Sequence, residues 1–162
     1  MASAYIELHV RSAFSFLRGG STPEDYAIQC NELGQSSMAL LDVDGVYGAP
    51  RFHQKMTKNS LTPHIGAEVT CTDGARYPLL VANRRGYQNL CRMISRMKLR
   101  TAKHPKPGKE AAVTHEELEE FSEGLICLSG DEDGPLAQAL NKGTVLGGHP
   151  KPANGGHLKT GQ

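Results

Sequence analysis

Short apolar runs alternate along the chain with stretches whose apolar residues recur at helical spacing. The alternating and continuous apolar runs predict strands at residues 5–10, 38–41, 65–72, 77–82 and 125–128. Helical spacing, with capping residues at two of the starts, predicts helices at 21–34, 49–59, 85–99 and from residue 114 onward. This order of strand and helix predicts an α/β fold with parallel strands, in which functional groups gather beyond the carboxyl ends of the strands.

Two stretches do not follow this pattern and set the expected domain limits. Residues 101–112 are rich in Lys, Pro and Gly, and we expect a mobile connector there. Residues 143–162 contain six glycines and almost no apolar residues, so we expect a disordered or unrelated tail. One domain over residues 1–142 is the resulting prediction.

Composition narrows the class of protein without naming a partner. The 162 residues are 38% hydrophobic and 22% charged, with a net charge of +1, which excludes a disordered chain and a strongly basic nucleic-acid binder. The start of the chain lacks a basic and an apolar signal region, and no apolar run could span a membrane, so we expect a cytoplasmic protein. No pair of cysteines has zinc-binding spacing, and buried free thiols are expected for Cys30, Cys71, Cys91 and Cys127.

Residues whose side chains could bind a metal or take part in catalysis lie on the predicted strands and in the loops that follow them. The strand-end loops hold Arg11, Asp42, Asp44 and Asp131, with His9 and Glu68 on the neighbouring strands. Two histidines one residue apart on a strand face the same side and can bind a divalent metal. This chain has His9-Val10-Arg11, and an arginine offers a metal a repelling positive charge and no lone pair.

The order and spacing of several motifs resemble one known family. Residues 8–21 are similar to the first motif of the PHP (polymerase and histidinol phosphatase) domain of bacterial DNA polymerase III alpha-type subunits, and residues 41–48 and 65–69 are similar to its second and third motifs. The segments 86–91 and 123–130 resemble later parts of the same domain. The resemblance covers residues 5–134 and is strongest to the error-prone branch.

This resemblance implies a partial PHP-type (β/α) barrel, truncated before its last strands, with a degenerate metal site. His9 and Glu68 match family ligands, but Arg11 and Val43 replace histidines and Arg18 replaces an aspartate. Asp131 stands where many relatives carry cysteine, and Asp42, Asp44 and Asp131 are nearby candidate ligands. Intact relatives bind Zn²⁺ or Mn²⁺, whereas we expect no cofactor for this chain. We expect Arg11 and Arg18 to form ion pairs with Asp42, Asp44 and Glu68 in the vacated site.

The resemblance also implies a function for the longer protein. It would be an error-prone DNA polymerase that synthesises DNA in replication and damage-tolerant repair, with Mg²⁺ in a polymerase core that these residues lack. Its partners would be the remainder of the polymerase and a DNA primer-template, and this chain would be a non-catalytic structural fragment. A free-standing PHP-family metal-dependent phosphoesterase is the alternative, and a truncated or frameshifted product is a third possibility.

A basic segment leaves two interpretations open. Nine of the 18 Lys and Arg residues lie between Arg84 and Lys109, where there is no acidic residue. Such a strip could neutralise DNA phosphates, and the candidate contacts are Arg92, Arg96, Lys98 and Arg100. Alternatively, the strip is a solvated helix face balanced by the acidic segment 116–123.

Overall fold

The computed structural model describes residues 5–106 and 110–146 of the chain. Its strands are β1 (Glu7–Val10), β2 (Ser37–Val43), β3 (Thr62–Thr70), β4 (Arg76–Val81) and β5 (Leu125–Cys127). Its helices are α1 (Pro23–Glu32), α2 (Ala49–Lys58), α3 (Arg84–Arg100), α4 (His115–Glu120) and α5 (Pro135–Leu146). None of the described helices combines the length and the apolar character needed to cross a membrane.

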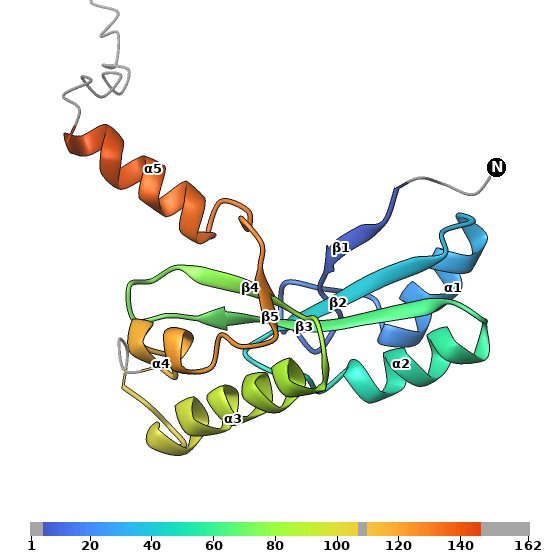
Figure 1. The fold of residues 1–162 in the computed structure, drawn as a ribbon, viewed down its shortest axis with the longest axis horizontal. Coiled ribbons are helices and arrows are strands. Elements are labelled where there is room, and N and C mark those ends of the chain that lie inside the picture. Colours follow the sequence, from blue (N-terminus) through green and yellow to red (C-terminus); the bar gives the residue numbers. More distant parts are fainter. Residues whose placement is uncertain (1–4, 107–109, 147–162) are drawn as a thin grey trace, which may run out of the picture.

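The strands form one open five-stranded sheet in the order β1-β2-β3-β4-β5. Strands β1, β2 and β3 are parallel, and the register places Val43 of β2 opposite Glu68 of β3. In Figure 1, α2, α3 and α4 lie along one side of the sheet, and α5 projects away from it on the other side. The α/β fold class is therefore confirmed, with an open sheet consistent with a partial barrel.

The expectation of parallel strands needs correction in the second half of the sheet. Strand β4 runs antiparallel to β3, and β5 runs antiparallel to β4. For β4 the reason is local, because the turn at Asp73 and Gly74 returns the chain directly beside β3, without a crossover helix. Gly74 adopts a φ of +87°, and Asp73 Oδ1 accepts a hydrogen bond from the Ala75 amide at 2.8 Å.

Two apolar clusters hold the helices against the sheet. Buried residues of α1, α2 and β2, with Phe52 and Met56 fully enclosed, form the first cluster. The second joins β3 and β4 to α3 and includes Leu90, Met93 and Met97. These three residues recur at the three- and four-residue spacing of a helix face, which is why the sequence predicts α3 well. The clusters fix the strand ends that carry the candidate site.

Strand β5 is less buried than the sequence predicts. Ile126 is 52% exposed and Cys127 is exposed, because β5 is a short edge strand paired only with β4. The cysteine prediction is correct for Cys30 and Cys71, which are buried free thiols, whereas Cys91 is only partly buried. The run of four apolar residues therefore indicated a strand correctly. The burial of that strand depends on which elements pack against it, and the run carries no information about them.

Local details at the helix starts also differ from the sequence analysis. Helix α1 begins after Thr22, whose side chain and backbone exchange hydrogen bonds with Asp25 in a capping box. The helix therefore begins at Pro23, two residues after the predicted start at residue 21, and Asp25 is its capping acid. Residues 101–106 and 110–112 contain no helix or strand, and 107–109 lie outside the described residues. The predicted tail at 143–162 overlaps the end of α5, and residues 147–162 lie outside the described part of the chain.

Candidate functional site

The candidate site begins at the end of β1, where His9 and Arg11 both reach Glu68. His9 lies on β1 and Arg11 directly follows the strand, with Val10 between the two, so the His9 and Arg11 side chains leave the backbone on the same side. Glu68 lies near the end of β3, across the intervening strand β2, and its side chain is fully buried. The parallel arrangement of β1 to β3 thus brings residues from two separate motifs together at one end of the sheet.

Arg11 holds Glu68 with two hydrogen bonds. Its Nε donates to Glu68 Oε2 at 2.6 Å, and its Nη2 donates to Glu68 Oε1 at 2.6 Å. His9 Nε2 lies 2.7 Å from Glu68 Oε1. Arg11 Nη2 also donates to Asp131 Oδ2, so the guanidinium lies between a buried carboxylate and a partly exposed one. The two hydrogen bonds between the planar Arg11 guanidinium and the Glu68 carboxylate are the bidentate arrangement typical of arginine–carboxylate pairs.

The charges of this cluster stabilise one another. Burial alone would raise the pKa of Glu68, but hydrogen bonds from His9 and Arg11 and the Arg11 charge outweigh it, so the pKa of Glu68 is below its ordinary value. The hydrogen bond and charge of Arg11 also lower the pKa of Asp131. The hydrogen bond to Glu68 is the largest influence on Arg11 and raises its pKa. Both carboxylates are therefore ionised and paired at neutral pH.

Asp42 has a different role from the one expected of a strand-end carboxylate. It is 1% exposed and accepts hydrogen bonds from the Ser12 amide (2.7 Å) and from the Ser12 and Ser15 hydroxyls (2.7–2.9 Å). The Val43 amide donates in turn to Ser15 Oγ at 3.0 Å. Asp42 therefore anchors the loop that follows β1, and it forms no ion pair with Arg11 or Arg18 among the described residues.

Asp44 also binds backbone and hydroxyl groups. Its Oδ1 accepts from the Thr70 amide and its Oδ2 from the Thr70 hydroxyl, both at 2.8 Å. Asp44 has a φ of +51°, a left-handed conformation that aspartate tolerates better than most residues. Its own amide donates to the Glu68 carbonyl at 2.7 Å, which ties this turn to β3 beside the buried carboxylate.

The ion-pair hypothesis is correct for Arg11 and wrong for the partner of Arg18. Arg18 Nη1 donates to Asp133 Oδ2 at 3.0 Å, and Arg76 Nη1 donates to the same oxygen at 3.0 Å. Sequence reasoning missed Asp133, although the acidic run Asp131-Glu132-Asp133 in the loop after β5 was a signal for it. Arg11, Arg18 and Arg76 together fasten the loop after β5 to the body of the sheet.

The residues at this position do not fit a divalent metal. Both oxygens of Glu68 already bind the Arg11 guanidinium, and the one His9 nitrogen near them shares the same carboxylate. Val43, which stands opposite Glu68 in the register, has an aliphatic side chain with no donor atom. To bind here, a metal ion would have to displace the Arg11 side chain from buried Glu68. The positively charged guanidinium would then remain nearby and repel the metal ion. Arg11 therefore occupies the position where a metal would contact Glu68.

Part of the basic face of α3 is paired with the acidic segment. Arg96 binds Glu120 through two hydrogen bonds at 2.6 and 3.0 Å, and Arg100 binds Glu117 at 2.7 and 2.9 Å. The balanced-face interpretation is correct for these residues. Arg92 and Lys98 are exposed and form no ion pair within the described part of the chain. The four DNA contacts predicted on α3 remain a prediction.

Comparison with known families identifies the domain. The PHP domain model matches residues 7–154 of the chain. The chain belongs to the PHP domain family. This PHP domain is 35% identical over 139 residues to an error-prone DNA polymerase of Bdellovibrio bacteriovorus, and 37% identical over 148 residues to one of Anaeromyxobacter dehalogenans. The matches cover 79% and 86% of this chain but 13% of each polymerase.

Solved structures resemble the PHP domain more distantly. The lesion-specific endonuclease EndoQ of Pyrococcus furiosus aligns over 75% of this chain and 33% of its own, with a TM-score of 0.49 and 12% identity. An amidohydrolase of Chromobacterium violaceum aligns over 59% of this chain and 34% of its own, with a TM-score of 0.49 and 20% identity.

Proposed function

We propose that this chain is the PHP part of an error-prone DNA polymerase and acts there as a structural module without hydrolytic activity. The match of the PHP domain model, together with the similarity to error-prone DNA polymerases over 79% and 86% of this chain, supports the first half of the proposal. The second half rests on one observation, the bidentate ion pair between Arg11 and buried Glu68. The guanidinium of Arg11 is always charged and is covalently part of the chain, so it takes the place of a metal ion that could bind and dissociate.

The ion pairs also suggest what the module does. Arg11 joins the end of β1 to β3 and to Asp131, and Arg18 joins the following loop to Asp133. These contacts link segments that are far apart in sequence, as a bound metal cluster would. The module would thereby present a fixed surface to the remainder of the polymerase, which would act on a DNA primer-template in the cytoplasm.

Hydrolytic activity is tested with the purified chain, Mn²⁺ or Zn²⁺, and the phosphomonoester p-nitrophenyl phosphate. We expect product formation at the rate of the metal-containing buffer alone, because no described residue near Glu68 is free to position a metal-activated water. The matched control is the Glu68→Gln variant, which should show the same rate. Metal-dependent turnover that is lost in Glu68→Gln would contradict the structural role and favour a phosphoesterase.

The polymerase half of the proposal has a separate test in the genomic DNA that follows the codon for Gln162. We expect a polymerase coding region there, with the carboxylates that hold two metal ions for nucleotidyl transfer. Primer extension by the complete gene product then measures the activity directly. A downstream region that encodes no polymerase would contradict this half and leave the conclusion on hydrolysis unaffected.

A further inference from the structure

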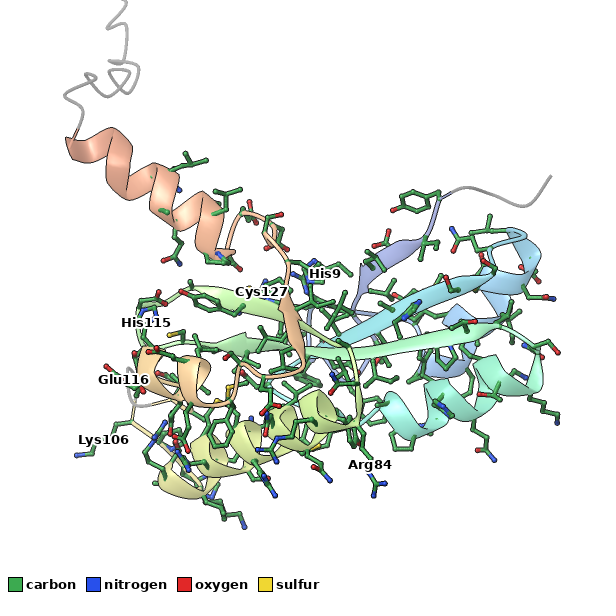
Figure 2. The ribbon with its side chains drawn as sticks, viewed as in Figure 1. His9, Arg84, Lys106, His115, Glu116 and Cys127 are labelled. Carbon is green, nitrogen blue, oxygen red and sulfur yellow. The ribbon has the colours of Figure 1, made fainter. Side chains whose placement is uncertain are left out.

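A second group of metal-ligating side chains lies away from the candidate site, at the β3–β4 turn. Cys71 directly follows β3, Asp73 lies in the turn after it, and His115 is the first residue of α4. The backbone explains how they meet, because Cys71 and Val113 form a parallel bridge in which the Thr72 amide donates to the Val113 carbonyl at 2.9 Å. In Figure 2, His115 lies at one end of the sheet beside Glu116, clearly separated from His9.

The donor atoms lie close enough together to share one ion. His115 Nε2 is 3.1 Å from Asp73 Oδ2, and the three donor atoms all lie within 4.8 Å of one another. Ligands on a tetrahedral zinc, at bond lengths of about 2.0–2.3 Å, are separated by roughly 3.3–3.6 Å. The Asp73 and His115 donor atoms already lie near that spacing. Among the described residues, this is the one group of three or more such donors.

The neighbours of the group hold the ligands in position. Asp73 Oδ1 accepts from the Ala75 amide at 2.8 Å, and Asp73 Oδ2 accepts from the Tyr77 hydroxyl at 3.1 Å. The Tyr77 ring packs edge-on against the His115 ring, with 6.1 Å between their centroids. Hydrogen bonds and packing that orient a ligand before the metal arrives are a regular feature of protein metal sites.

Exposure and charge indicate the kind of ion. Cys71 is 2% exposed, whereas the His115 side chain is 58% exposed, so the group is closed on the sulfur side and open to solvent on the imidazole side. One thiolate and one carboxylate would neutralise a divalent cation, and the neutral imidazole completes three ligands. A mixed sulfur, nitrogen and oxygen set suits Zn²⁺ better than Mg²⁺, Ca²⁺ or Mn²⁺, which prefer oxygen.

We propose that Cys71, Asp73 and His115 form a zinc site with a fourth position open to water, and that the ion fastens the β3–β4 turn to the start of α4. The site shares no residue with the group around Glu68, and it does not depend on the proposed polymerase function. The Cys71 sulfur binds the ion as a thiolate, so its proton is released to solvent when the ion binds.

Titration of the metal-free chain with Co²⁺, a spectroscopic substitute for Zn²⁺, tests the proposal. We expect one equivalent to bind with a sulfur-to-cobalt charge-transfer band, and Zn²⁺ to displace it. His115→Ala should weaken binding at least about 100-fold. This variant changes an exposed side chain, so folding should be unaffected, and circular dichroism checks it. Cys71→Ser should abolish the band.

Two variants serve as matched controls. His104 lines the same surface hollow as Cys71 but is not part of the group, and Cys127 is an exposed free thiol. His104→Ala and Cys127→Ser should bind Co²⁺ like the unaltered chain. Binding that survives His115→Ala unchanged, a bound cobalt without the thiolate band, or an absence of binding by the unaltered chain would each overturn the proposal.

Discussion

Replacing Arg11 by methionine is expected to lower the free energy of unfolding by about 3–5 kcal/mol, because Glu68 would remain buried without the guanidinium that balances its charge. Glu68 is fully buried, and His9 would be the partner that remains for it among the described residues. Methionine keeps much of the length of the arginine side chain, so lost packing contributes little. Urea denaturation at pH 7 measures the difference.

Arg18→Met provides the matched control for this prediction. Arg18 and Asp133 are each about two-fifths exposed, and Asp133 would keep Arg76 as a partner. We expect a loss below about 1 kcal/mol, as for other exposed ion pairs. A double variant, Arg11→Met with Glu68→Leu, should recover much of the lost stability because it removes the buried charge as well. Equal effects of Arg11→Met and Arg18→Met would contradict this account of the site.

Asp42→Ala is the second substitution with a large expected effect, a loss of about 3 kcal/mol of unfolding free energy. The carboxylate is 1% exposed and accepts from the Ser12 amide and from the hydroxyls of Ser12 and Ser15. Alanine would leave these donors buried without an acceptor. The loop after β1 would loosen, and Arg11, which precedes Ser12, would lose its fixed position.

Thermal and urea denaturation of Asp42→Ala and Asp42→Asn distinguish this role from a general charge effect. Asparagine keeps one carbonyl acceptor of the same shape, so Asp42→Asn should lose less stability than Asp42→Ala. If both variants unfolded with the midpoint of the unaltered chain, the anchoring role of Asp42 would be wrong.

Residue pattern predicted much of the fold, because helix faces and buried strands are local signals. Leu90, Met93 and Met97 recur at helical spacing, and α3 forms where that spacing indicates. The direction of β4 was a harder problem. The alternation of strands and helices predicted parallel strands, but the turn at Asp73 and Gly74 returns the chain beside β3 and makes β4 antiparallel to it.

The candidate site was predictable to the extent that strand order determines it. Because β1 to β3 are parallel, the rule for strand ends places Arg11 near Glu68. The rule fails for Asp42, whose nearest donors are Ser12 and Ser15, and for Arg18, whose loop reaches Asp133. Such contacts depend on the paths of loops, which no periodic pattern specifies.

The group at Cys71 could not be found by spacing either. Cys71 and Asp73 are neighbours in sequence, but His115 reaches them only because Val113 bridges Cys71. Sequence analysis predicted a buried thiol at Cys71, which is correct, and His115 is exposed. Their proximity is a property of the tertiary fold.

A crystal grown with excess Mn²⁺ tests the central claim most directly, because anomalous scattering locates the ion while the electron density shows the position of Arg11. We predict that the guanidinium lies between Glu68 and Asp131, with no manganese peak within bonding distance of His9 or Glu68. A well-occupied manganese peak bound by His9 and Glu68, with Arg11 displaced from both carboxylates, would contradict the account.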